Sequence, residues 1–337
     1  MTNDSTQPTT EPPDEPDAQS VLQLSSVASD GVIQRRLFDV TSRDGLRIAA
    51  VRHTKISGAL RPDIVVIVHG WSGDRTGPAD ILRQLADSLA ADGTDCIRFD
   101  LLGRGESDDP LSGAPTLDGM INDTLDVISH IDKAFDADPQ NDGKTQERPP
   151  LHLIGLCSGG NVALGAASFL KPRVKTVVGL SVLPFQEHTD DRLSGARAKR
   201  HRQAVWKKLF QATTWKKLIT GGIDYKRVLR GFSGKETGTQ AKPSAAADKA
   251  SESAERNPKR SARDIISELS DWRGRLNLIY SEYDKEGAVA AVVFQSVLRG
   301  LPLSLNVSTI PDTDHNFYSV RAHQAIAELI KPIVNQR

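Results

Sequence analysis

Hydrophobic residues along the chain alternate between short strand-like runs and longer helical patterns. The first run, at 33–40, is followed by a second at 46–53, and the Arg-Asp-Gly segment at 43–45 predicts a β-hairpin with an Asp-Gly turn. The next run, within 63–70, is hydrophobic and β-branched. Such a run is typical of a strand buried on both faces of a parallel sheet. The pattern therefore changes from an antiparallel hairpin to parallel strands.

The same alternation of strand and helix continues to the end of the chain. Further strands are predicted at 95–102, 151–156, 174–182, 276–280 and 303–310. Helices are predicted after Pro78, after a Thr116 cap, and over 158–170, 288–298 and 322–330. This order implies right-handed crossovers and an α/β fold with a mostly parallel central sheet flanked by helices. A chain of 337 residues is long enough for one large domain of this kind.

One connection, between the strands predicted at 174–182 and 276–280, is far longer than an ordinary α/β loop. We predict a helical cap at 186–265, inserted between two parts of the core at 31–185 and 266–337. Residues 191–235 of the cap contain thirteen Lys or Arg against two Asp, so the cap is basic. Residues 234–261 have almost no hydrophobic side chains to bury, which predicts a flexible linker.

The ends and the overall charge exclude several classes of protein. Residues 1–30 predict a disordered acidic tail, and their start lacks the basic and hydrophobic regions of a secretory signal. No hydrophobic run reaches the roughly 18 residues of a membrane span. The two cysteines are too few for a disulfide framework, so a reducing, cytoplasmic location is predicted. The net charge of zero gives no indication of a nucleic-acid partner.

The most informative segment is 151–160, a short hydrophobic strand that leads through small residues into a helix. Its Gly-Leu-Cys-Ser-Gly part at 155–159 matches the nucleophile elbow, where small residues stand two positions on each side of the nucleophile. Larger side chains there would clash with the strained turn. A nucleophilic Ser158 would place Leu156 at a small-residue position, so Cys157 is the predicted nucleophile. The alternative for Cys157 is a buried, inert thiol.

The position of Cys157 at a helix N-terminus favours its thiolate, and a nearby imidazole would favour the thiolate further. The predicted base is His315, because it follows the last strand and the order of this arrangement is nucleophile, acid, histidine. His323 lies within the last helix and is expected on the surface. The other cysteine, Cys96, lies inside a strand and is expected in the core.

An acid that orients the base is expected after the strand at 276–280, where Glu282, Asp284 and Glu286 follow one another closely. Asp284 is the predicted acid because it stands three residues after the small Ser281, and Glu282 is the alternative. Otherwise this cluster is a solvated turn.

A candidate oxyanion loop follows the first buried strand, at His69-Gly-Trp71. The backbone N–H groups of Trp71 and Ser158 are the predicted donors to a developing oxyanion. His69 itself is expected to be a packed or hydrogen-bonded loop residue and not the base.

Taken together, these motifs resemble the α/β-hydrolase superfamily from His69 to His315. The segment Arg-Phe-Asp-Leu-Leu-Gly-Arg-Gly-Glu-Ser-Asp at 98–108 is similar to the strand-and-turn motif of that superfamily. The resemblance implies the α/β-hydrolase fold with a cap after the sixth strand of the core. A cysteine at the elbow is similar to dienelactone hydrolases and polyhydroxyalkanoate synthases. The Gly-Leu-Cys-Ser-Gly form most resembles exosortase-associated hydrolases in the serine aminopeptidase-like branch.

The predicted function is hydrolysis of a small-molecule ester or thioester through an acyl-enzyme on Cys157, with His315 and Asp284 completing the triad and no metal or cofactor. Two alternatives remain open: an acyltransferase that uses the same acyl-cysteine, and a non-catalytic binding module. The basic cap is either a solvated lid or a surface that attracts anionic substrates or membrane surfaces. Its candidate hydrophobic face consists of Trp206, Leu209, Trp215 and Leu218.

Overall fold

The computed structural model describes residues 25–29, 31–111, 113–138, 147–185 and 257–336. The predicted tail up to residue 24 lies outside the described residues. So does the predicted cap from 186 to 256, with Trp206, Trp215 and most of the expected linker.

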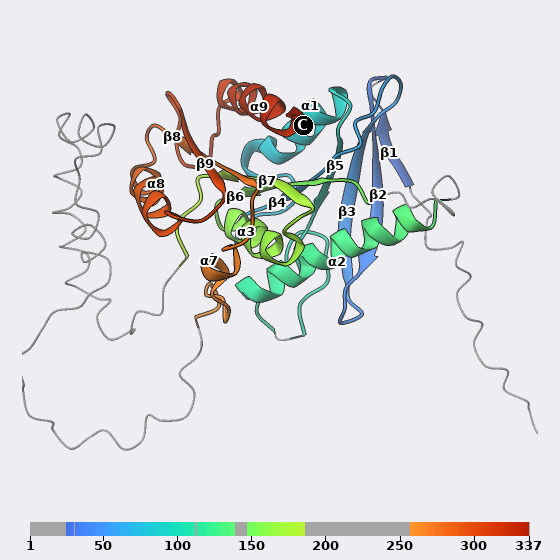
Figure 1. Cartoon of the computed structure of the whole chain (residues 1–337). Helices are drawn as coiled ribbons and strands as arrows, with labels where there is room; N and C mark the ends of the chain where they lie inside the picture. The colour runs from blue at the N-terminus through green and yellow to red at the C-terminus, as the bar shows by residue number, and fades with distance from the viewer. Residues whose placement is uncertain (1–24, 30, 112, 139–146, 186–256, 337) are drawn as a thin grey trace, which may run out of the picture.

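A nine-stranded sheet runs through the described chain in the order β1-β2-β3-β5-β4-β6-β7-β8-β9 (Figure 1). The strands β1 to β3 and the link from β3 to β5 are antiparallel, whereas all pairs from β5 through β9 are parallel. The predicted hairpin and the mostly parallel sheet are therefore confirmed. The strands are β1 Ser25–Ser29, β2 Ile33–Thr41, β3 Arg47–Lys55, β4 Ile64–Val68, β5 Asp95–Phe99, β6 Leu151–Leu156, β7 Val174–Leu180, β8 Arg275–Ser281 and β9 Ser304–Ile310.

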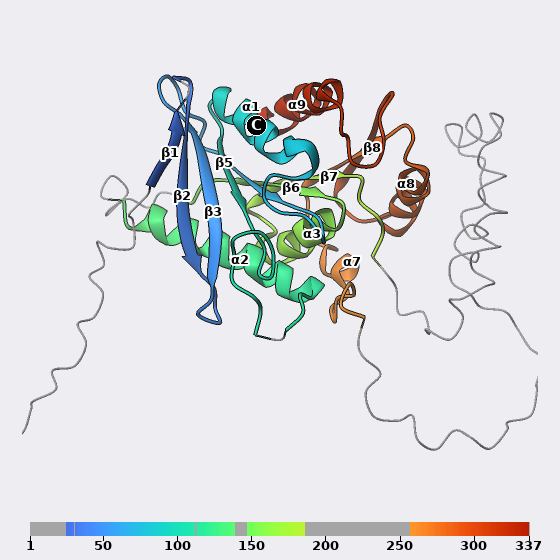
Figure 2. The same cartoon turned by 180° about the vertical axis from the view of Figure 1, so that it is seen from behind.

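Helices cover both faces of this sheet (Figure 2). Helices α1 (Ile81–Ala91, after the short 3-10 helix η2 Pro78–Asp80) and α9 (Val320–Asn335) pack on one face. On the other face lie α2 (Leu117–Asp136), α3 (Ser158–Leu170), α7 (Ile265–Glu268) and α8 (Lys285–Val297). None of the described helices is long and hydrophobic enough to cross a membrane.

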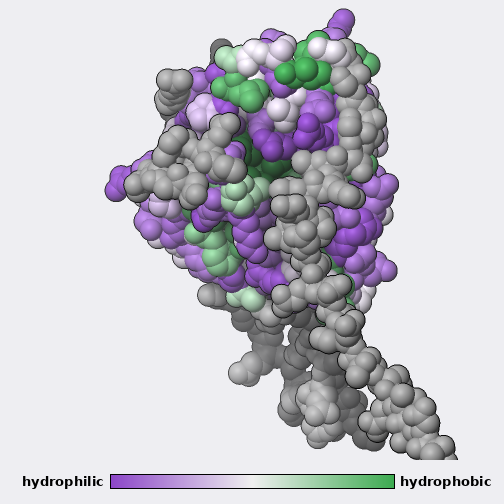
Figure 3. All heavy atoms as spheres, turned by 90° about the vertical axis from the view of Figure 1, so that its right-hand side faces the viewer, coloured by the Kyte–Doolittle hydropathy of each residue, from purple (hydrophilic) through white to green (hydrophobic). Residues whose placement is uncertain are grey.

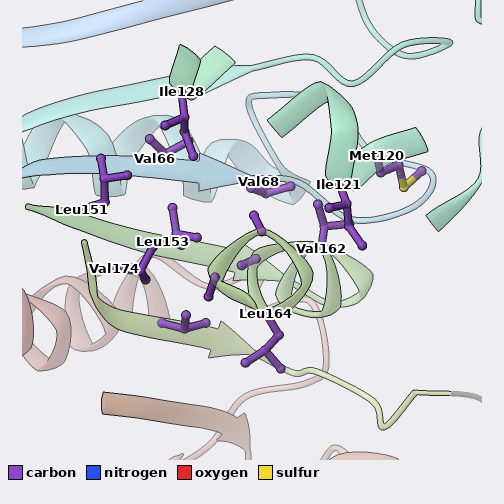
Figure 4. Packing of buried hydrophobic residues seen from close by; sticks show 14 of the residues in the cluster. Val66, Val68, Met120, Ile121, Ile128, Leu151, Leu153, Val162, Leu164 and Val174 are labelled. Atoms are coloured by element: carbon purple, nitrogen blue, oxygen red, sulfur yellow. The ribbon is translucent and has the colours of Figure 1, made fainter. Parts of the chain in front are cut away.

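The alternation of side chains along the central strands explains this layering. All five residues of β4 are buried, with Val66 and Val68 packed against α2 and α3, and Val65 and Ile67 packed against α1. Figure 4 shows part of the first cluster, with Met120 and Ile121 of α2 beside Val162 of α3, and Ile128 of α2 beside Val66 of β4. In contrast, hydrophilic residues cover most of the described surface on the side seen in Figure 3.

Two expectations about irregular segments need correction. The tail was expected to extend to residue 30, but Ser25–Ser29 forms β1, which pairs with the edge strand β2 through backbone groups. The linker was expected to extend to residue 261, but its last residues pack on the start of α2, where Leu117 N donates to Pro258 O (2.8 Å) and Ser261 Oγ donates to Asp118 (2.5 Å). In both places backbone or capping hydrogen bonds stabilise segments with few hydrophobic side chains.

Candidate active site

Cys157 lies in the sharp turn between β6 and α3. Its φ of 52° and ψ of −122° place a non-glycine residue in a sparsely populated region of conformational space. The turn is fixed on both sides, because Cys157 N donates to Leu180 O of β7 (2.7 Å) and Gly160 N donates to Cys157 O (3.0 Å). The thiol is therefore held at the carboxyl edge of the sheet, as predicted for a nucleophile elbow.

The flanking glycines make this turn sterically feasible. A Cβ atom at Gly155 would lie 2.2 Å from Gly159 O, and one at Gly159 would lie 2.5 Å from the carbonyl oxygens of Val68 and His69. Atoms at such distances overlap, so both positions exclude any side chain. The turn around Cys157 therefore requires glycine at both positions.

His315 lies on the loop between β9 and α9, next to Asp284. Its Nδ1 is 2.6 Å from Asp284 Oδ2. Asp284 is buried at the start of α8, and its other oxygen accepts a hydrogen bond from Gly287 N (2.9 Å). Asp284 therefore orients the imidazole while its own position is fixed by the helix that it caps.

The charges of this pair follow from their contacts. The hydrogen bond with Asp284, followed by a side-chain hydrogen bond with Cys157, raises the pKa of His315 to about 10, although burial opposes this. Burial raises the pKa of Asp284, but the hydrogen bonds from His315 and Gly287 outweigh burial, so the net shift of this pKa is downward. At neutral pH, His315 is a cation and Asp284 an anion. The structure thus pairs His315 with Asp284 and brings Cys157 close enough to His315 to raise its pKa further.

The loop after β4 passes directly beside Cys157. A Cβ atom at Gly70 would lie 3.3 Å from Leu156 O and 3.5 Å from Cys157 Cβ. The next residue is Trp71, whose carbonyl oxygen accepts from Arg104 Nε (2.6 Å). Ser158 begins α3, so its N–H has no acceptor within the helix. The two predicted oxyanion donors thus belong to segments that border Cys157.

His69 links this loop to the segment after β5 through hydrogen bonds of its ring. It is buried, Leu101 N donates to its Nε2 (3.1 Å), and its Nδ1 therefore carries the proton that is donated to Gly70 O (2.7 Å). Burial lowers the pKa of His69, which keeps the ring neutral. As expected from its place in the sequence, His69 is a hydrogen-bonded loop residue.

Asp100 has a supporting role that the sequence did not reveal. It is fully buried after β5 and accepts hydrogen bonds from Arg75 N (2.7 Å) and Glu106 N (2.9 Å), besides an ion pair with the Arg75 side chain. Gly105, with a φ of +52°, leaves room for it, since a Cβ there would be 2.2 Å from Asp100 Cγ. The motif at 98–108 thus joins the carboxyl end of β5 to the segment that follows Trp71.

Two other candidates lie elsewhere. Glu282, the alternative acid, accepts from Asp312 N (3.0 Å) in an exposed turn, whereas the hydrogen-bonded carboxylate of His315 is Asp284. His323 is not on the surface, contrary to expectation. It is buried, with Nδ1 3.2 Å from Gln84 Oε1 of α1, because it shares the buried face of α9 with Ala322.

Two further kinds of site are metal-ligand groups and cavities. Among the described residues, no group of three or more His, Cys, Asp or Glu side chains is arranged to hold a metal ion. A surface cavity of about 410 Å3, with Lys55, Arg61 and Asp92 in its wall, lies at the amino ends of the parallel strands. It is therefore at the edge of the sheet opposite Cys157.

Comparisons with known proteins agree with this architecture. A family model described as "Alpha/beta hydrolase family" matches residues 65–329. No curated protein matches the chain. Among solved structures, the chain is similar to Est1E from Butyrivibrio proteoclasticus with bound ferulic acid (15% identity, 87% of this chain and 96% of that chain, TM-score 0.52). It is also similar to a putative hydrolase from Agrobacterium vitis (18%, 90% and 99%, 0.52) and to an esterase from Pyrococcus furiosus (15%, 93% and 96%, 0.51). At these identities the likeness shows the fold.

Proposed function

The chain belongs to the alpha/beta hydrolase family, and from that premise we propose that it cleaves a carboxylic ester or thioester through an acyl-enzyme on Cys157. The observation that supports this proposal is His315, whose Nδ1 is 2.6 Å from Asp284 Oδ2 and whose pKa is raised by Asp284 and also by Cys157. A nucleophile, a proton carrier and an orienting acid in this order are the minimum for covalent acyl transfer.

In the first half of the reaction, the sulfur of Cys157 attacks the carbonyl carbon and a carbon–sulfur bond forms. The N–H groups of Trp71 and Ser158 stabilise the oxyanion. As the bond to the alcohol or thiol breaks, the His315 imidazolium donates its proton to the leaving group. Its positive charge also balances the charge on sulfur during attack.

In the second half, water attacks the acyl-cysteine. Neutral His315 accepts the proton of this water while Asp284 holds the ring and stabilises the imidazolium that forms. The bond to sulfur breaks, the acid is released, and His315 keeps the proton taken from water for the next cycle. Every step uses side chains and backbone groups of the chain itself.

Replacement of the thiol tests the proposal. With an activated ester such as 4-nitrophenyl acetate, we expect Cys157→Ala to lose about a thousandfold or more of kcat/KM, and mass spectrometry of the parent enzyme to detect an acyl adduct on residue 157. The matched control is Cys96→Ala, which removes the other cysteine of the chain, buried in β5. A Cys157→Ala enzyme as fast as the parent would refute the proposal.

Two further measurements refine it. Activity in Cys157→Ser would show that the site accepts the hydroxyl nucleophile that is usual at this turn. Product analysis with an added alcohol would separate hydrolysis from acyl transfer, because only transfer yields a new ester.

A further inference from the structure

Two cationic side chains surround Trp71, the residue that follows the nucleophile-contacting Gly70. Arg104 Nε donates to the Trp71 carbonyl (2.6 Å), and Lys259 Nζ lies 5.5 Å from the centre of the Trp71 ring. Lys259 is exposed, so its ammonium group lies over the aromatic face at the surface of the molecule. Positive charge is thus present within one residue of the loop that borders Cys157.

The position of Lys259 is fixed by the segment where the chain returns to the core. Pro258 O accepts from the first N–H of α2, and Asn257 Oδ1 accepts from Lys259 N (3.1 Å). Two residues later, Ser261 is held by Asp118. The backbone is thus anchored on both sides of Lys259, which places the start of this side chain next to Trp71.

These cations have no counter-charge in the part of the chain that the structure describes. No carboxylate there forms an ion pair with Arg104, Lys259 or Arg260. The nearby carboxylates already have partners: Asp118 accepts from Ser261 and Ala262, and Glu106 pairs with Arg75.

Arg260 follows Lys259 in the chain and has two unpartnered donors. Its Nε and Nη2 atoms are shielded from solvent and have no hydrogen-bond partner. Shielded donors without acceptors are unfavourable, so an anion that accepted from both atoms would stabilise this half-buried side chain. The Nε and Nη2 edge of a guanidinium carries two parallel N–H donors that fit the two oxygens of a carboxylate.

We propose that Arg104, Lys259 and Arg260 form a carboxylate-binding subsite beside the nucleophile, so that the substrate is an ester or thioester carrying a second, free carboxylate. This inference rests on the proposed function, because it assigns the substrate class of the same site. The reacting carbonyl lies at Cys157 and the free carboxylate at the cations around Trp71.

Matched esters test the subsite. The probes are 4-nitrophenyl hydrogen adipate and its methyl ester, which differ in one negative charge. We expect the parent enzyme to prefer the charged ester by about tenfold in kcat/KM, and Lys259→Gln to reduce that preference about threefold. Lys259→Glu reverses the charge, and Arg260→Gln removes the two parallel N–H donors of the guanidinium. Each should reduce the preference for the charged ester about tenfold. Lys133→Gln, an exposed lysine of α2, is the control with the same change in net charge and should keep the preference.

A binding measurement separates this inference from the proposed function. Calorimetric titration with adipate requires no turnover, and we expect Kd to rise about tenfold in Lys259→Glu. Hydrolysis of both esters at equal rates, together with an unchanged Kd or no adipate binding, would overturn the subsite and leave the proposed function intact. Adipate binding that depends on Lys259, with neither ester hydrolysed, would support the subsite and count against the hydrolase.

Discussion

At the level of single residues, the site depends on close backbone approach around Cys157. The strand before the turn and the helix after it meet at Gly155 and Gly159, and the loop after β4 touches the same turn at Gly159. The positive φ of Cys157 is the consequence of this crowding. A methyl group added at Gly155 or Gly159 would therefore displace the backbone of the turn that carries Cys157.

We expect Gly155→Ala to lower the free energy of unfolding by about 3 kcal/mol and activity at least about tenfold, because its Cβ would overlap the backbone of Gly159. Urea denaturation and kcat/KM on an activated ester measure the two effects. Gly73→Ala is the matched control, since a Cβ there has its nearest neighbour at an ordinary 3.7 Å. Equal stability of both variants would contradict the steric argument.

The pairing of His315 with Asp284 also predicts how stability depends on pH. Because the folded-state pKa of His315 is raised to about 10, its pairing stabilises the fold fully below the unfolded value of about 6.5 and is lost as the pH rises through 10. We expect His315→Gln to cost about 1–2 kcal/mol at pH 6, since the imidazole is one-third exposed, and almost nothing at pH 10.

Denaturation of both proteins at pH 6, 8 and 10 measures this difference. The control is His130→Gln on α2, because burial lowers the pKa of His130 and its contribution should not change above pH 7. A stability difference for His315→Gln that is constant between pH 6 and 10 would show that the pair does not titrate as described.

At the level of elements, a buried charged cluster attaches α1 to the antiparallel side of the sheet. Asp87 of α1 accepts from His53 Nδ1 of β3 (2.7 Å) and from Arg35 of β2 (2.8 Å). Arg98 of β5 donates to the other nitrogen of the same imidazole (2.9 Å). Burial opposes ionisation of Asp87, but hydrogen bonds from His53 and Arg35 prevail and lower its pKa to about 2.

We expect Asp87→Asn to destabilise the protein by about 3 kcal/mol, because the half-buried Arg35 and the buried His53 would lose the carboxylate to which they donate. Since the folded-state pKa is depressed, the contribution of Asp87 is present above about pH 4 and is lost as the pH falls toward 2. Urea denaturation at pH 7 measures the loss. Asp39→Asn, which removes the exposed partner of Arg47, should change stability by less than about 0.5 kcal/mol.

The strands and helices also differ in how well the sequence predicts them. Strands β4 and β6 were predicted at or near their observed ends because every residue of each is buried, and α3 because the elbow fixes its start. Strand β1 was missed because its Ser-Ser-Val-Ala-Ser sequence has little hydrophobic signal and pairs through its backbone. Asp100 and Lys259 gain their roles only from contacts with residues far away in the chain, which no local pattern encodes.

For the whole molecule, the decisive feature is that strands on either side of the segment 186–256 belong to one sheet. Strand β7 precedes this segment, β8 follows it, and the two pair in parallel from Thr176↔Arg275 to Leu180↔Ile279. Two side chains after this segment bind backbone before it: Trp272 Nε1 donates to Val174 O and Tyr280 Oη to Val182 O, both at 2.9 Å. The parts of the chain on either side therefore share one core, and His315 and Asp284 reach Cys157 across it.

This continuity predicts that the protein remains folded after a cut in the segment 186–256. After cleavage at a protease site introduced between residues 236 and 255, we expect the two fragments to co-elute in size-exclusion chromatography and to unfold in one transition, because β7 and β8 remain paired. Trp272→Ala should weaken their association by about 3–5 kcal/mol, since this buried ring packs in the shared core. The exposed Val320→Ala is the control and should have no such effect. Fragments that separate without denaturant would show that the pairing of β7 with β8 depends on the covalent connection.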